Sequence, residues 1–260
     1  MTDALIGHTG FVGGSLAARH RFGACFNSTN IESIRGQRFD TLVVSGMPAA
    51  KWLANRDSLG DRAVLDRLWS NIKECEANTV VVISTVDVYP APIGVNEGTF
   101  VEPSLQQPYG RHRLELEHRI SYRFPRVLAV RLPGLYGPGL KKNAIYDLLN
   151  NNGIEKIHPD GTYQFYNLNR LWSDIRSALA ADLSVANLAT EPVTMREVAR
   201  HAFGFKFGDS PMSLPPRYDV RTKHAPVFGG RNGYLETKSE VLAGIASFVA
   251  SERKPMRVAA

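Results

Sequence analysis

The sequence has few cysteines and no long apolar run. Its two cysteines, Cys25 and Cys75, are too few and too far apart for a disulfide framework, and no Cys/His spacing suggests zinc. No stretch approaches about 18 apolar residues, and the first residues lack the basic flank and long apolar core of a signal peptide. We therefore expect no metal ion, no membrane partner, and a reducing, cytoplasmic setting.

Long runs of charge of one sign are also absent. Lys and Arg number 31 against 25 Asp and Glu, a net charge of +6, yet no basic run is longer than Lys141-Lys142. Single-strand binders interleave basic and aromatic side chains, a pattern missing here, so we expect no nucleic-acid partner. The excess of positive charge fits either a solvated basic surface or a site for a phosphorylated ligand. A length of 260 residues with 43% hydrophobic residues fits one large domain, or one domain with a small appendage.

Short apolar runs alternate with stretches of helical spacing along the chain. Strands are predicted over residues 3–6, 24–26, 41–44, 79–83, 127–132 and 185–188. Helices are predicted over 11–20, 57–75, 106–123, 144–150 and 170–182, and two more open at the capping boxes Thr194/Glu197 and Thr237/Glu240. This alternation predicts an α/β fold, a Rossmann-type doubly wound parallel sheet of about six strands. Only about a dozen residues separate the second and third strands, so the sheet is expected to be shortened.

Three glycines follow the first apolar run at constant spacing. Gly7, Gly10 and Gly13 lead into the first predicted helix, where backbone N–H groups and the helix dipole converge on one point. The first glycine permits a tight turn, the second lets a ligand approach, and the third lets helix and strand pack closely. Alone, the motif fits an ordinary turn equally well. The strand–helix alternation around it favours a diphosphate cradle.

Two further stretches carry reactive side chains. Ser84, Thr85 and Asp87 follow the apolar run TVVVI, at the end of a strand where open α/β sheets bind ligands. Tyr109 and Arg113 are four residues apart on one predicted helical face, and a nearby cation lowers the pKa of a phenol. Each feature alone also fits a polar strand end or an ordinary surface pair.

Taken in order, these motifs resemble the extended short-chain dehydrogenase/reductase family of NAD(P)-dependent sugar-nucleotide epimerases, dehydratases and reductases. The stretches that carry the resemblance are 7–13 (GHTGFVG), 84–89 (STVDVY), 108–113 (PYGRHR) and 131–139 (RLPGLYGPG). The resemblance is clear over residues 3–140, and over the remainder it extends only to the order of the predicted elements. The resemblance implies NAD(P)(H) as cofactor, a nucleotide sugar as substrate, and a homodimer built from the helices predicted over 57–75 and 106–123.

The resemblance also implies a division of the chain into two parts. The dinucleotide-binding Rossmann domain would span 1–140, with 166–190 returning to the sheet. A small substrate-binding region would take 141–165 and 191–260.

Roles can be carried over by position. Thr85 aligns with the Ser/Thr that hydrogen-bonds the substrate oxygen, and Tyr109 with the general acid/base. Arg113 takes the place of the lysine that holds the nicotinamide ribose and depresses the tyrosine pKa, and Asp87 would act as acid or base beside the substrate. Besides Tyr109 and Arg113, the implied cofactor contacts are Gly7, Thr9, Gly10, Phe11, Val12, Gly13, Asn27, Ser28, Ser45, Gly46, Ala49, Ser84 and Pro133. The candidate substrate contacts are Asp87, Lys141, Lys142, Asn143, Arg170 and Arg217.

Three departures from the family pattern bear on function. Arg113 replaces a lysine, a swap that changes shape and donor geometry. The second strand ends in Asn27 and Ser28 with no carboxylate for the adenosine ribose, which favours NADP slightly and leaves NAD open. Asp87 is a single carboxylate where dehydratases carry an Asp-Glu pair, which favours epimerisation or reduction over dehydration.

The sequence therefore predicts an NAD(P)-dependent oxidoreductase or epimerase acting on a nucleotide-linked sugar, with hydride transfer and Tyr109 as general acid/base. The alternative is a dinucleotide-binding regulator or scaffold that kept the fold and lost the reaction. Arg113 is the residue on which the two hypotheses differ.

Overall fold

The computed structural model describes residues 2–253, and in that range six parallel strands form the main sheet, in the order β10-β6-β4-β3-β1-β2. The strands are β1 (Thr2–Ile6), β2 (Ala24–Phe26), β3 (Arg38–Val44), β4 (Glu76–Thr85), β6 (Val127–Leu132) and β10 (Val185–Asn187). The chain runs from β1 to β2 on one side and then to β3 on the other. The switch point of the sheet, where such folds bind ligands, thus lies between β1 and β3. The predicted doubly wound, shortened sheet is confirmed.

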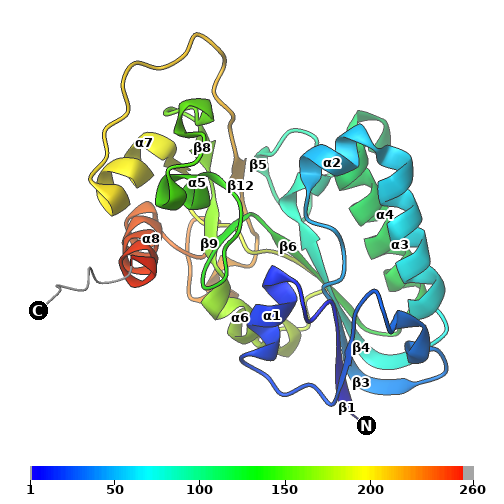
Figure 1. Ribbon diagram of the computed structural model, residues 1–260. Coiled ribbons are helices and arrows are strands. Elements are labelled where there is room, and N and C mark those ends of the chain that lie inside the picture. Colours follow the sequence, from blue (N-terminus) through cyan, green and yellow to red (C-terminus); the bar gives the residue numbers. More distant parts are fainter. Residues whose placement is uncertain (1, 254–260) are drawn as a thin grey trace, which may run out of the picture.

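Helices cover both faces of this sheet (Figure 1). On one face lie α2 (Lys51–Arg56), α3 (Ser58–Ile72) and α4 (Pro108–Arg123), and on the other α1 (Phe11–Ala17) and α6 (Leu171–Ala180). Successive side chains of a strand point to opposite faces. Val80 and Val82 accordingly pack in the core under α3 and α4, and Val81 packs in the core under α1 and α6. Because both faces are buried, the strands read in the sequence as continuous apolar runs.

A smaller group of elements lies beyond the carboxyl end of the sheet (Figure 1). Its helices are α5 (Ala144–Asn150), α7 (Met195–Val198) and α8 (Lys238–Glu252), which share a core that includes Ile145, Val198 and Ile245. Both predicted capping boxes form, at the starts of α7 and α8. The short strands are β5 (Ile93–Val95), β7 (Gly134–Tyr136), β8 (Thr162–Tyr163), β9 (Phe165–Asn167), β11 (Val193–Thr194) and β12 (Asp219–Val220).

Short 3-10 or π turns connect these elements: η1 (Ile31–Ile34), η2 (Val86–Val88), η3 (Pro103–Leu105), η4 (Ile154–Lys156), η5 (Leu168–Arg170), η6 (Ala199–Phe203) and η7 (Ala225–Phe228). Several bounds differ from the prediction by a few residues, and two differences bear on the site. The six-residue α2 was not predicted, because it is too short to show helical periodicity. Strand β4 extends further than residues 79–83, so Ser84 and Thr85 belong to the strand itself. No helix within residues 2–253 is long and apolar enough to span a bilayer.

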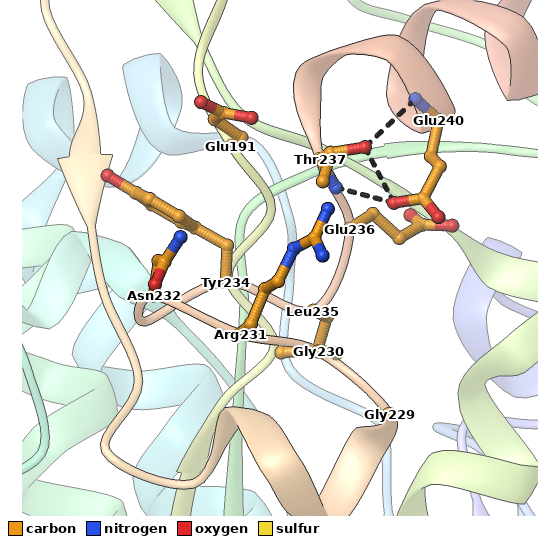
Figure 2. Close-up of a pocket in the computed structure, with 10 residues that line it drawn as sticks. All are labelled: Glu191, Gly229, Gly230, Arg231, Asn232, Tyr234, Leu235, Glu236, Thr237 and Glu240. Atoms are coloured by element: carbon orange, nitrogen blue, oxygen red, sulfur yellow. Dashed lines mark hydrogen bonds between the residues drawn. The ribbon is translucent and has the colours of Figure 1, made fainter.

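A pocket of about 250 Å³ opens beside the start of α8 (Figure 2). Its walls come from Glu191 and from residues between 229 and 240. Of the described residues that line it, none belongs to the predicted site. The predicted chemistry therefore has to be sought at the carboxyl edge of the main sheet.

Candidate active site

The turn after β1 lies at the switch point of the sheet. Gly7 has a φ of +87°, and a Cβ there would lie 2.5 Å from the carbonyl oxygen of Ser45, so only glycine fits. A Cβ on Gly13 would lie 2.0 Å from the carbonyl oxygen of Gly7, which means that α1 packs directly on the turn. No side chain caps the start of α1 at Gly10, and its first turn has no acidic residue. The turn thus offers a close backbone approach at an uncapped helix start, as a diphosphate would need.

The end of β3 borders this turn. Ser45 hydrogen-bonds through its backbone N–H to Ile6 at 2.9 Å, but its hydroxyl oxygen is buried and has no hydrogen-bond partner among residues 2–253. Buried hydroxyls nearly always have a partner, so a bound ligand would satisfy Ser45. Gly46 follows, and Ala49 is exposed on the same loop. The glycine turn and the unused hydroxyl together fit a dinucleotide.

The end of β2 carries neutral groups and one cation. The side-chain oxygen of Asn27 accepts from Thr29 N–H at 2.8 Å, which closes a local turn. Arg67, from α3, donates to the carbonyl oxygen of Ser28 at 3.2 Å and lies 3.8 Å from Glu32. No sequence motif predicts Arg67 at this position. It reaches β2 because only η1 lies between β2 and β3, and α3 packs against η1.

Thr85, Asp87 and Tyr109 meet at the carboxyl end of β4. Asp87 donates its backbone N–H to Thr85 Oγ1 at 3.1 Å, and Thr85 Oγ1 lies 3.5 Å from Asp87 Oδ2. A Cβ on Gly110 would lie 2.0 Å from the carbonyl oxygen of Asp87, so the start of α4 is packed tightly on this turn. Burial raises the pKa of Tyr109 above its usual value, although Arg113 and a hydrogen bond with Thr85 act in the opposite direction. The phenol is therefore protonated at neutral pH, contrary to the lowering that we expected from the cation alone.

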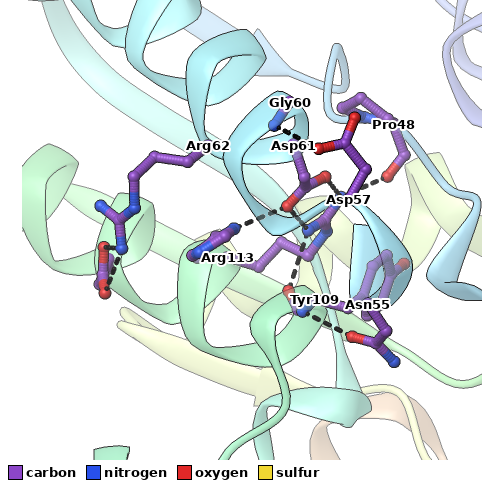
Figure 3. A network of polar contacts seen from close by, with 10 residues as sticks. Pro48, Asn55, Asp57, Gly60, Asp61, Arg62, Tyr109 and Arg113 are labelled. Atoms are coloured by element: carbon purple, nitrogen blue, oxygen red, sulfur yellow. Dashed lines mark hydrogen bonds and ion pairs between the residues drawn. The ribbon is translucent and has the colours of Figure 1, made fainter. Parts of the chain in front are cut away.

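Arg113 lies behind Tyr109, in a buried ion pair between α3 and α4 (Figure 3). Its two terminal nitrogens donate to the two oxygens of Asp61 at 2.8 and 2.9 Å, and also to the carbonyl oxygens of Tyr109 and Pro48 at 2.9 and 2.6 Å. The guanidinium carbon lies 3.8 Å from the centre of the Tyr109 ring. Burial alone would raise the pKa of Asp61, but hydrogen bonds from Arg113 and His112 outweigh it and hold that pKa below its usual range. The predicted cation is beside Tyr109, and a carboxylate that we did not predict compensates its charge.

Sequence reasoning also missed Lys51 and Tyr218. Lys51 Nζ donates to Asp87 Oδ1 at 2.7 Å and to the Tyr218 hydroxyl at 3.1 Å, and Tyr218 in turn donates to Asp87 Oδ1 at 3.0 Å. Burial alone would lower the pKa of Lys51, but the charge of Asp87 raises it. Lys51 does follow the third predicted strand, where strand-end residues gather, and that was the one usable signal. Nothing in the sequence points to Tyr218.

Some predicted site residues have other partners in the structure. The Ser84 hydroxyl donates to Glu117 of α4, so the side chain faces that helix. Asn143 caps α5, where its side-chain oxygen accepts two backbone N–H groups. Arg170 pairs with Asp174 at 3.3 Å and with Glu236 at 3.1 Å, a different cluster. The structure does not bring Ser84, Asn143 or Arg170 to the Tyr109 hydroxyl.

Of the remaining predicted residues, Pro133 lies at the sheet edge and Lys142 contacts the loop after β3. Pro133 directly follows Leu132, which is in register with Thr85, so it lies at the same sheet edge. Lys142 reaches the loop between β3 and α2, where its Nζ donates to the carbonyl oxygen of Ala49 at 2.8 Å. Those that stay exposed or partly exposed are Thr9, Phe11, Val12, Lys141 and Arg217, of which Phe11 and Val12 also pack against the core. Within residues 2–253, no group of three or more His, Cys, Asp or Glu could hold a metal ion.

Comparison with known proteins bears on the fold. A scan of protein-family models and a search of curated proteins found no match. Among solved structures, a UDP-glucose 4-epimerase from Thermotoga maritima, in complex with UDP-glucose, has a TM-score of 0.71 at 14% identity, over 98% of this chain and 99% of that one. A dTDP-4-dehydrorhamnose reductase from Clostridium acetobutylicum has a TM-score of 0.72 at 14% identity, over 97% and 100%. TunA, an NAD-dependent NDP-hexosamine 5,6-dehydratase of tunicamycin biosynthesis, has a TM-score of 0.71 at 17% identity, over 98% and 99%.

These three proteins are named for three different reactions, so a shared fold does not choose among them. At these identities the likeness concerns the fold alone. It agrees with the order of the motifs that the sequence carries. The chain therefore has the fold that these three solved structures share.

Proposed function

We propose that this chain is an NAD(P)-dependent oxidoreductase or epimerase that acts on a nucleotide-linked sugar. The observation that carries the proposal is the meeting of Thr85, Asp87 and Tyr109 at the same sheet edge as the glycine turn. Proteins of this fold are named for UDP-glucose, dTDP-4-dehydrorhamnose and an NDP-hexosamine, which supports the substrate class. The cofactor would lie on the 1–140 part, and the sugar against the 141–165 and 191–260 part.

The cofactor would supply or accept the hydride when bound. Gly7, Gly10 and Gly13 would hold its diphosphate, and Ser45 would use its free hydroxyl. NADP(H) is favoured over NAD(H) because Arg67 lies at the carboxylate-free end of β2, where a 2′-phosphate could replace Glu32 as its partner.

The chain's own residues would handle the proton. Tyr109, protonated at neutral pH, gives its phenol proton to the sugar oxygen, and Thr85 holds that oxygen by a hydrogen bond. The guanidinium of Arg113, stacked on the ring, stabilises the tyrosinate that remains. Asp87 lies 3.5 Å from Thr85 and stands where dehydratases carry an Asp-Glu pair, which favours reduction or epimerisation over dehydration.

The test combines purified protein with NADPH or NADH and a panel of nucleotide sugars. Absorbance follows the nicotinamide, and chromatography follows epimer formation. Tyr109→Phe should lower kcat by about 10²- to 10⁴-fold, the usual contribution of a positioned acid/base. Tyr122→Phe, on the exposed side of the same helix, is the matched control. Unchanged turnover in Tyr109→Phe would remove Tyr109 from the mechanism.

One observation favours the second candidate, a dinucleotide-binding regulator or scaffold. The terminal nitrogens of Arg113 are committed to Asp61, Tyr109 and Pro48, which leaves at most its Nε–H for a cofactor ribose. Calorimetry separates the candidates. Tight dinucleotide binding without turnover on any sugar, and without rescue by Arg113→Lys, supports the regulator.

We also propose a homodimer formed through α3 and α4. Large apolar side chains are exposed on these helices: Leu59 is 82% exposed, Val64 47% and Tyr122 93%. A cytoplasmic location is proposed because Cys25 is an exposed free thiol, which a reducing compartment preserves.

A further inference from the structure

A buried tyrosine that gives up its proton has to recover one from solvent. Tyr109 is only 8% exposed, so its neighbours decide how that proton arrives. Arg113 covers the ring, but a guanidinium does not release its proton in proteins and cannot pass one on. Asp61, behind it, is 3% exposed at its side chain. The side of Tyr109 that faces α3 is therefore closed to proton exchange.

The opposite side of Tyr109 leads to solvent through three side chains. Thr85 interacts with Tyr109 and lowers the pKa of its phenol, and the Thr85 hydroxyl lies 3.5 Å from one oxygen of Asp87. The other oxygen of Asp87 accepts from Lys51 Nζ at 2.7 Å. The Lys51 side chain is 42% exposed, against 19% for Asp87, so the ammonium group is the point where this series of side chains meets water.

We propose that Thr85, Asp87 and Lys51 form the proton path between Tyr109 and solvent. The proposal rests on the acid/base role proposed above for Tyr109. After Tyr109 has lost its proton to the substrate oxygen, the Thr85 hydroxyl passes its proton to the tyrosinate. One oxygen of Asp87 takes a proton from Lys51. The carboxyl group then rotates and donates this proton to Thr85. Lys51, now a neutral amine, takes a proton from water, and each group regains its starting state.

The charges around the path keep its solvent end protonated. The groups that face Lys51 are Asp87 from the end of β4 and Tyr218 from the segment before β12. Those that face Tyr109 are Arg113, Asp87 and Lys51. Lys51 is an ammonium at neutral pH, since Asp87 raises its pKa, and it is therefore loaded with the proton that the path has to deliver.

Lys51→Arg tests the path without removing the charge. The variant keeps a cation beside Asp87 and Tyr218 but cannot release a proton. Lys73→Arg, on the exposed end of α3, is the matched control. Ligand-free protein is taken through a rapid upward pH jump while tyrosinate absorbance is followed, and the Tyr109 phase is identified by its loss in Tyr109→Phe.

We expect Lys51→Arg to slow the Tyr109 phase by about a hundredfold, the scale of a positioned proton-transfer group, and Lys73→Arg to leave it unchanged. In turnover, Lys51→Arg should make kcat depend on buffer concentration, and methylamine should partly rescue Lys51→Ala. If the Tyr109 phase keeps its wild-type rate in Lys51→Arg, the proposed proton path is wrong. If instead Tyr109→Phe keeps full turnover while the phase slows in Lys51→Arg, the proton path stands and the proposed function fails.

Discussion

Tyr109 is held as a neutral phenol by its surroundings. Burial is the largest influence on its pKa and raises it, Asp87 raises it further, and the stacked Arg113 only partly offsets them. For an acid that has to donate, a raised pKa extends the active form to higher pH. In the direction of sugar reduction we therefore expect kcat to stay level through neutral pH and to fall only above about 10. A pH series of kcat, with folding checked at each pH, measures this, and a midpoint near neutrality would contradict it.

Arg67 gives a prediction about cofactor choice. If a 2′-phosphate binds at the end of β2, Arg67→Gln should weaken NADPH binding by about 10- to 100-fold, the worth of one charge-assisted hydrogen bond. NADH binding should stay unchanged. Calorimetry on the ligand-free protein measures both affinities. Arg62→Gln, on the same helix and paired with Glu115, is the control. An equal loss of affinity for NADPH and NADH would show that Arg67 does not bind the 2′-phosphate.

Residues of the site were predictable to different degrees. The glycines, Thr85 and Tyr109 lie in contiguous motifs, each beside the strand or helix that positions it. Lys51 and Tyr218 are 167 residues apart in the sequence and meet only because the smaller region folds back over the sheet edge. Asp61 could not be predicted as the partner of Arg113 either, since a buried arginine requires a carboxylate but the sequence does not say which one.

At the scale of elements, α3 and α4 are joined by two Asp–Arg pairs of unequal burial. Asp61 and Arg113 are 3% and 2% exposed at their side chains, whereas Asp66 and Arg119 are 48% and 35% exposed. Asp61→Asn leaves a buried guanidinium without its counter-ion and should lower the free energy of unfolding by about 3–5 kcal/mol. Asp66→Asn should cost about 1 kcal/mol or less. Urea denaturation compares the two, and similar losses would contradict the role of burial.

The contribution of the Asp61–Arg113 pair to the free energy of unfolding depends on pH, and the direction of this dependence follows from the pKa of Asp61. The pKa of Asp61 is lowered in the folded chain, so its contribution is present above the unfolded pKa of about 4 and is lost as pH falls through the lower folded value. The stability difference between the wild type and Asp61→Asn should therefore shrink in acid.

Elements with strong boundaries were the easiest to predict. Helix α5 has the predicted bounds, because Asn143 caps its start and Asn151, with a φ of 52°, ends it. Strand β2 also has its predicted bounds. Helix α2 had no such signal, and it carries Lys51. Sequence reasoning thus missed a short helix on which the proposed proton path depends.

For the whole molecule, the proposed dimer gives a prediction about size in solution. Tyr122→Arg should shift the protein from dimer to monomer, because a cation would replace an exposed aromatic side chain in the proposed interface. Sedimentation velocity measures the shift. Leu214→Arg, on an equally exposed apolar side chain outside α3 and α4, should leave the mass unchanged. A wild-type protein that sediments as a monomer contradicts the proposal.

The two outer strands of the main sheet have a consequence for how copies of the chain meet. Both β2 and β10 are three residues long, and they form the two edges of the sheet in the described part of the chain. So short an edge offers an incoming extended segment few unpaired backbone groups, which is how natural sheets resist growth by strand addition. The parallel core can therefore be apolar throughout without acting as a template for aggregation, and association between copies is left to helix surfaces.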